Sequence, residues 1–102
     1  MANPSMFVKL TAQPGKRAEL LAAFAPMLDA VAAEPGTLVY SINTDDADAD
    51  VVWVFEQYAD DAALASHSSS DAMKALMGTM GPLLADAMLA STSPHGSKGI
   101  DL

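Results

Sequence analysis

The chain of 102 residues is long enough for one domain with a single core, and its 51% hydrophobic and 18% charged residues exclude disorder. Thirteen acidic side chains against five basic ones give a net charge of −8, which repels nucleic acid and anionic membrane surfaces. Cysteine is absent, which excludes disulfides and thiolate chemistry, and no apolar run reaches the roughly 18 residues of a membrane span.

The first third of the chain predicts a strand followed by a helix. Met1-Ala2-Asn3-Pro4 has neither a basic nor an apolar segment of the secretory type, so we expect a cytoplasmic protein. Ser5 to Ala12 predicts a strand, and Gln13-Pro14-Gly15 ends it. From Lys16 onward, apolar residues recur at the spacing of one buried helical stripe: Leu20, Phe24, Met27, Leu28 and Val31.

Two features shape this predicted helix. Pro26 removes one backbone hydrogen bond, and because the stripe continues in phase to Val31 we expect a kink there and not an end. Pro35-Gly36 then ends the helix, with Gly36 free to take a left-handed conformation.

The middle of the chain predicts a hairpin with a long acidic loop. Residues 37–44 and 51–58 are rich in β-branched and aromatic side chains, and the link from Asp45 to Asp50 is polar enough to be solvated. The run from Val51 to Phe55 is apolar at every position, so both of its faces need cover.

A short helix, a longer helix and a last strand are predicted after the hairpin. Asp60 is a natural N-cap, and because His67 lies three residues after Leu64 it shares the inward face and should be at least half buried. Asp71 is the second expected cap. The residues after it form the predicted buried stripe of the longer helix: Met73, Leu76, Met77, Met80, Leu83 and Leu84.

The end of the chain predicts a strand and an arm. We expect a fourth strand from Ala87 to Ser93 and a C-terminal arm over residues 94–102.

The order strand, helix, strand, strand, helix, strand is that of the ferredoxin-like fold, an α+β sandwich of two helices on one antiparallel sheet. Two helices cover only one face of the sheet. An apolar second face is most simply covered by another copy of the chain, so we expect a homodimer within a single-domain chain spanning 1–102.

Three stretches resemble the antibiotic biosynthesis monooxygenase domain: 34–40 (Glu-Pro-Gly-Thr-Leu-Val-Tyr), 54–58 (Val-Phe-Glu-Gln-Tyr) and 61–67 (Asp-Ala-Ala-Leu-Ala-Ser-His). The resemblance implies a dimeric α/β barrel. Its superfamily includes cofactor-free quinol and anthrone oxygenases, haem-degrading enzymes and proteins of no known activity. The asparagine and tryptophan typical of the haem-degrading members are not in place here, since Trp53 lies on a strand, so haem is the less favoured ligand.

His67 is the only histidine inside the predicted core and is a candidate general base for a phenol or hydroquinone; its alternative is a packed residue bonded to a backbone carbonyl. Glu56 is a second candidate catalytic residue, against a structural hydrogen bond. Four aromatic residues could form the wall of a substrate pocket or belong to the plain core: Tyr40, Trp53, Phe55 and Tyr58.

No metal or other cofactor is predicted. Asp46, Asp48 and Asp50 have the first EF-hand spacings, but Val51 stands where the loop needs glycine and Gln57 where it needs glutamate.

Three functions follow from these observations. The first is a cofactor-independent monooxygenase that oxidises a small aromatic hydroquinone or polyketide-like phenol with O₂. The alternatives are a non-catalytic small-molecule-binding or stress-associated protein and a haem-degrading enzyme.

Overall fold

The computed structural model describes residues 3–100, and the predictions for Asp101 and Leu102 lie outside them. Four strands and four α-helices follow one another, with a 3₁₀ turn (η1) before the last strand. Their bounds are β1 Ser5–Ala12, α1 Arg17–Ala23, α2 Ala25–Ala32, β2 Thr37–Thr44, β3 Val51–Tyr58, α3 Asp61–Ser68, α4 Asp71–Met80, η1 Gly81–Leu83 and β4 Leu84–Thr92.

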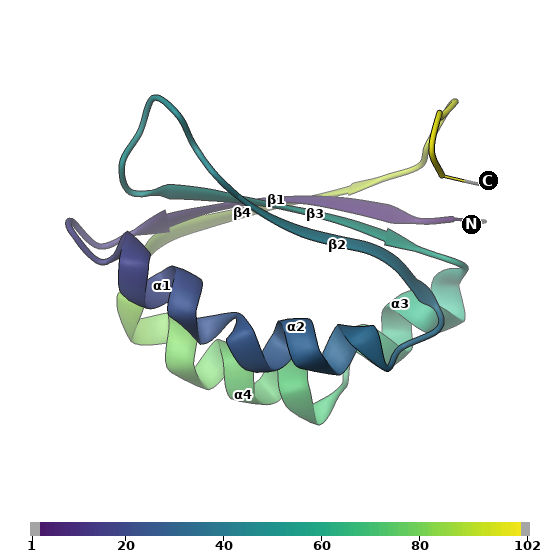
Figure 1. The fold of residues 1–102 in the computed structure, drawn as a ribbon, viewed down its shortest axis with the longest axis horizontal. Helices are drawn as coiled ribbons and strands as arrows, with labels where there is room; N and C mark the ends of the chain where they lie inside the picture. The colour runs from purple at the N-terminus through teal and green to yellow at the C-terminus, as the bar shows by residue number, and fades with distance from the viewer. Residues whose placement is uncertain (1–2, 101–102) are drawn as a thin grey trace.

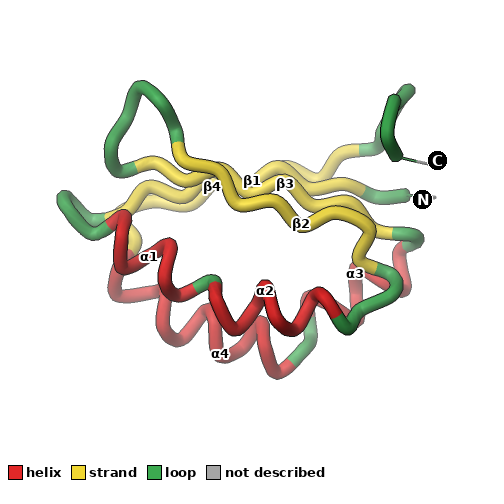
Figure 2. Tube along the Cα trace, viewed as in Figure 1, coloured by secondary structure: helices red, strands yellow, loops and turns green. Residues whose placement is uncertain are grey.

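The strands form one antiparallel sheet in the order β2-β3-β1-β4. Figure 1 shows α1, α2 and α4 lying along one face of this sheet, with α3 beneath the end of β2 and β3. The same two layers are clear in Figure 2, where every helix lies on one side of the strands. This arrangement confirms the predicted α+β ferredoxin-like fold. None of the helices in the described part of the chain is long and apolar enough to cross a membrane.

Alternation along the central strands separates a core face from an open face. On the core face, side chains of β1 and β3 pack with residues of α1, α2, α4 and the turn between α1 and α2: Val8, Leu10, Val52, Val54, Leu20, Phe24, Met27 and Leu76. On the open face, Phe7 is 49% exposed and Trp53 40%. The rings of Phe7 and Phe55 lie 4.9 Å apart, and Lys9 Nζ lies 5.7 Å from the Trp53 ring.

The predicted first helix is two helices, so the expectation of a kink was wrong. Phe24 separates α1 from α2, and its N–H bonds to the carbonyl of Leu21 in a tighter turn. Pro26 causes the break because it has no N–H to continue the α-helical pattern. The turn also shifts the buried stripe: Met27 is 1% exposed, whereas Leu28, predicted to be buried, is 44% exposed.

Four smaller predictions were also wrong. Ser70, not Asp71, caps α4, because its hydroxyl accepts the N–H of Met73. Met77 is 61% exposed because α4 buries a narrower stripe, centred on Leu76. The last strand begins at Leu84, directly after η1. Gly36 does not take a positive φ.

Arg17 bonds three backbone carbonyl groups in and beside the acidic loop. Arg17 Nη1 donates to the carbonyl oxygens of Asp45 at 3.2 Å, Asp48 at 3.1 Å and Val51 at 3.4 Å. The Asp45 carboxylate accepts the Trp53 Nε1–H at 2.7 Å, and this hydrogen bond lowers the pKa of Asp45. Arg17 therefore fastens the β2–β3 loop to the start of α1.

Gly36 is required by close packing. A Cβ at this position would lie 2.6 Å from Cβ of Ala63 in α3, and the Gly36 carbonyl accepts the N–H of Ala59 at 2.9 Å. The short helix can approach the start of β2 only because residue 36 has no side chain.

We predict that Gly36→Ala lowers the free energy of unfolding by about 1–3 kcal/mol, because the added methyl group clashes with Ala63. Gly78→Ala is the matched control. Gly78 lies inside α4 with open space around it, so alanine there should raise stability by about 1 kcal/mol. Urea unfolding of both variants measures the two effects, and equal shifts in the same direction would contradict this account of Gly36.

Candidate functional site

The site is built around His67, which α3 carries into the protein. Asp60 begins the helix, as predicted, by accepting the N–H of Ala63 at 2.8 Å. His67 lies near the other end of α3 and is 2% exposed, which confirms the predicted burial. Leu64 is half-buried one turn earlier on the same helix. A helix of only eight residues thus places a polar ring in the interior.

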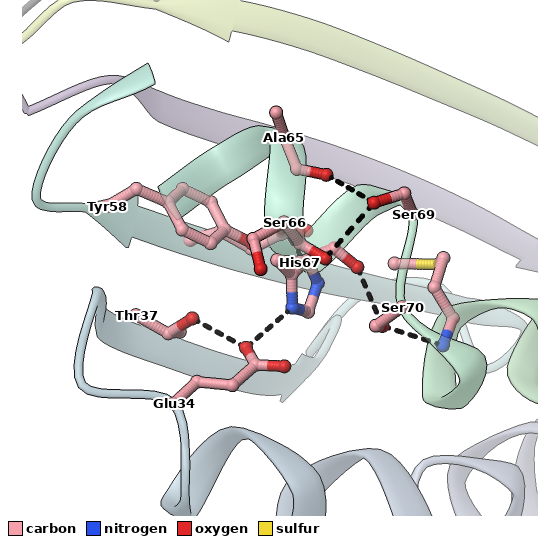
Figure 3. A network of polar contacts seen from close by, with 10 residues as sticks. Glu34, Thr37, Tyr58, Ala65, Ser66, His67, Ser69 and Ser70 are labelled. Atoms are coloured by element: carbon pink, nitrogen blue, oxygen red, sulfur yellow. Dashed lines mark hydrogen bonds and ion pairs between the residues drawn. The ribbon is translucent and has the colours of Figure 1, made fainter. Parts of the chain in front are cut away.

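The end of α3 is fixed by two serines. Ser69 Oγ donates to the carbonyl of Ala65 at 2.9 Å, and Ser70 Oγ donates to the carbonyl of His67 at 2.8 Å (Figure 3). Because Ser70 also caps α4, the backbone of His67 is bonded to the start of the next helix. This bonding limits the freedom of the imidazole to shift along the helix axis.

A carboxylate lies at each edge of the imidazole. On one edge, Glu34 Oε1 lies 3.0 Å from His67 Nδ1 and also accepts the Thr37 hydroxyl at 2.7 Å (Figure 3). On the other edge, Glu56 Oε1 lies 3.9 Å from His67 Nε2, beyond hydrogen-bond distance. Within residues 3–100, Nε2 has no hydrogen-bond partner, although it is buried.

Two tyrosines pack on the same ring. Tyr40 from β2 and Tyr58 from β3 place their ring centroids 5.4 and 5.3 Å from the centroid of His67. The Tyr58 hydroxyl donates to Glu56 Oε1. Burial raises the pKa of both tyrosines, and nearby carboxylates raise it further, so both hydroxyls stay protonated at neutral pH.

Burial likewise raises the pKa of the Glu56 carboxyl, while the Tyr58 hydrogen bond and the nearby His67 oppose the shift. The cluster thus combines an imidazole, two carboxyl groups and two phenols in a largely dry setting, where proton transfer is sensitive to small changes in geometry.

A cavity of about 350 Å³ opens beside the cluster. The loop from α2 to β2 forms one side and α3 the other, and the lining includes Glu34, Gly36, Thr37, Ser66 and His67. This volume lies at the small end of the range for ligand pockets.

The structure brings together four of the six predicted site residues. His67, Glu56, Tyr40 and Tyr58 are neighbours on the helix side of the sheet. Trp53 and Phe55, predicted to join Tyr40 and Tyr58 in one aromatic wall, lie on the open face instead. Strand alternation is the reason, because positions 53 and 55 point opposite to 56 and 58.

Sequence reasoning missed the roles of Glu34 and Thr37. Both belong to the Glu34-Pro35-Gly36-Thr37 turn, which resembles the family sequence and follows the end of α2. Glu34 is 33 positions before His67, and periodicity within one element cannot pair such residues. Within residues 3–100, no three histidine, aspartate or glutamate side chains gather closely enough to hold a metal ion.

Comparisons with solved structures agree with this fold. A Caulobacter crescentus protein, described as a candidate antibiotic biosynthesis monooxygenase, is 30% identical, covers 93% of this chain and 92% of its own, and has a TM-score of 0.86. A Chloroflexus aurantiacus protein with the same description is 25% identical over 98% of this chain and 100% of its own, with a TM-score of 0.82. A Mycobacterium tuberculosis protein, 23% identical over 94% and 98%, shows the same fold with a TM-score of 0.86.

The sheet topology and the enclosed histidine define a ferredoxin-like α+β domain with an acid–base cluster between the sheet and a short helix. Residues 5–79 match the model of the antibiotic biosynthesis monooxygenase family. The chain belongs to that family. No curated protein matched the sequence significantly.

The raised pKa of Glu56 leads to a prediction about stability. Between the ordinary carboxyl pKa of 4.5 and the higher pKa in the folded state, the folded protein binds more protons than the unfolded chain. The free energy of unfolding therefore falls as pH rises through this window. Glu56→Gln removes the titration, so its stability should fall less steeply with pH.

Urea unfolding measured from pH 4.5 upward tests this difference in slope. Glu19→Gln is the matched control, because the Glu19 side chain is 58% exposed on α1. The control should follow the wild-type slope. A Glu56→Gln slope equal to that of the wild type would show that burial does not shift the pKa of this carboxyl.

Proposed function

We propose that this protein is a cofactor-independent monooxygenase that oxidises a small aromatic hydroquinone or a polyketide-like phenol with O₂. The observation that carries the proposal is the buried, unpaired Nε2 of His67, held between two carboxyl groups in a member of a monooxygenase family. An imidazole nitrogen without a partner has a lone pair that can accept a proton from a substrate, once neighbouring groups move to admit it.

Proton transfer is the first step. Nε2 accepts the proton of a phenolic hydroxyl, and the resulting imidazolium is stabilised by the Glu34 carboxylate at 3.0 Å. The phenolate is far more electron-rich than the phenol. Glu56, Tyr58 and Tyr40 surround the ring that takes up the proton, and they keep bulk water away from it.

The phenolate form of the substrate then reacts with O₂. The phenolate passes one electron to O₂, and the two radicals combine to form a carbon–oxygen bond in a peroxide anion. This anion takes the proton back from the His67 imidazolium and becomes a hydroperoxide. Loss of water then leaves a carbonyl group. One oxygen atom enters the product, the other leaves as water, and the four electrons come from the substrate, so a hydroquinone becomes a hydroxyquinone.

Charge favours neutral substrates. Glu34 lies on the wall of the cavity, and the chain carries a net charge of −8, so an aromatic acid would be repelled. Thr37 and Ser66 also line the cavity, and a hydroxyl group can bond polar groups of a phenol.

Oxygen uptake with a chemically reduced naphthoquinone tests the proposal. His67→Ala should lower kcat by about 10²–10⁴-fold, the usual contribution of a general base. His95→Ala is the matched control, because His95 is exposed in the segment after β4, and it should keep the wild-type rate. Uptake that is equal in wild type and His67→Ala would remove His67 from the mechanism.

A second candidate is a non-catalytic binding protein of the same family. The observation that favours it is the 1% exposure of the His67 side chain, since a substrate reaches Nε2 only after neighbouring groups move. This candidate predicts saturable binding of the hydroquinone without oxygen uptake above the buffer rate. The same assay, run beside a binding titration, separates the two functions.

We also propose that two copies of the chain pack with their open sheet faces together. Large apolar side chains on this face are exposed in the single chain, among them Phe7 and Trp53, with Met88 at 60%. The β2–β3 loop and the segment after β4 rise from opposite ends of the face (Figure 1). They leave its middle open to a partner with the same surface.

Light scattering at micromolar concentration tests the dimer. Wild type should have twice the 10.6 kDa mass of one chain, and Phe7→Glu should lower the mass toward one chain because it buries a charge in the seam. Leu28→Glu is the matched control: Leu28 is 44% exposed on the helix side, against 49% for Phe7. A wild-type mass near one chain, or a Phe7→Glu mass equal to that of wild type, would contradict the proposed seam.

A further inference from the structure

Glu34 meets His67 through an oxygen that already accepts one hydrogen bond. Thr37 Oγ1 donates to Glu34 Oε1 at 2.7 Å, and His67 Nδ1 lies 3.0 Å from the same atom. A carboxylate oxygen has lone pairs and no proton to give, so the group that faces it must be a donor. In the neutral ring, the hydrogen therefore sits on Nδ1.

The opposite edge of the ring is consistent with this tautomer. With the hydrogen on Nδ1, Nε2 carries a lone pair, and Nε2 is a buried atom that finds no hydrogen-bond partner among residues 3–100. Glu56 Oε1, 3.9 Å away, accepts the Tyr58 hydroxyl and gives nothing to Nε2. Two acceptors thus face each other across a gap, which is a suitable place for a proton donated by a substrate.

We infer that Glu34 is a positioning residue, which fixes the Nδ1–H tautomer of His67 and so leaves Nε2 as the only basic atom of the ring. The tautomer follows from geometry alone, whereas its effect on turnover rests on the proposed monooxygenase function. Once Nε2 takes up a proton, the same Glu34 oxygen stabilises the cation through a charge-assisted hydrogen bond.

The ionisable groups that face His67 come from three segments. Glu34 belongs to the loop before β2, Tyr40 to β2, and Glu56 and Tyr58 to β3. The two tyrosines contact the ring through their own rings, and Glu56 is beyond hydrogen-bond distance. Of the ionisable groups in the described part of the chain, only Glu34 is close enough to select between the two ring nitrogens.

Nitrogen-15 NMR of labelled histidine tests the tautomer directly and needs no substrate. The chain has two histidines, so His95→Asn leaves a single imidazole to observe. At about pH 9, above the usual range for imidazole, the His95→Asn protein should show a protonated Nδ1 and an unprotonated Nε2. In that background, Glu34→Gln keeps an acceptor and should retain most of this signature. Glu34→Ala removes the acceptor and should give mixed tautomers.

Two control variants test whether the spectrum changes through loss of charge or through disturbance of the turn, and not through loss of the acceptor. Glu19→Ala removes an equal charge from an exposed site and should leave the spectrum unchanged. Thr37→Val keeps Glu34 but removes its second donor, so it reports on folding of the same turn without removing the acceptor. A His67 protonated at Nε2 in the His95→Asn protein, or a Glu34→Ala spectrum equal to that of its parent, overturns the inference.

The second measurement is kcat for the proposed reaction. If the proposed reaction takes place, Glu34→Ala should lower kcat by about tenfold to a hundredfold, the value of a hydrogen bond to a charged group, with a smaller change in KM. Glu34→Gln should recover part of the loss. Wild-type protein that shows the Nδ1–H tautomer but no oxygen uptake would retain the inference and reject the function, whereas an unchanged kcat in active Glu34→Ala protein would reject the positioning role.

Discussion

Side chains of β3 alternate between the two faces of the sheet, and this alternation decides what each face contains. Val52, Val54, Glu56 and Tyr58 point toward the helices, and the residues between them point to the open face. The inward series is apolar at its first half, where α1, α2 and α4 pack, and polar at its second half, where α3 docks. One strand thus supplies the core at one end and the acid–base cluster at the other.

The polar half is stable because nearly every group in it has a partner. Glu34 accepts from Thr37 and His67, Tyr58 donates to Glu56, and Ser70 holds the carbonyl of His67. A buried network of this kind costs little when satisfied and much when one partner is lost. Among the described residues, 3–100, Nε2 of His67 is the exception, and an unsatisfied atom inside a satisfied network is where chemistry is expected.

The fold was predictable because it rests on local patterns. The order of elements gave the topology, the Asp60 cap placed α3, and the spacing from Leu64 gave the burial of His67. The site was predictable only in part. Its partner Glu34 comes from a loop, and no periodicity relates a loop to a helix 33 residues away. Trp53 was wrongly placed in one aromatic wall with Tyr40 and Tyr58. The run of residues around it is apolar at every position, so the sequence shows no alternation between the two faces.

The two proposed surfaces share one backbone. Phe55 projects from the open face and Glu56, the next residue, projects into the acid–base cluster, so a partner seated on Phe55 would contact the strand that carries Glu56 and Tyr58. A seam of interdigitated side chains restrains the backbone beneath it. Because Nε2 and Glu56 Oε1 are separated by only 3.9 Å, a small displacement of β3 would change whether they can meet. In the proposed dimer, packing on Phe55 would therefore act on the position of Glu56 through the peptide unit between the two residues.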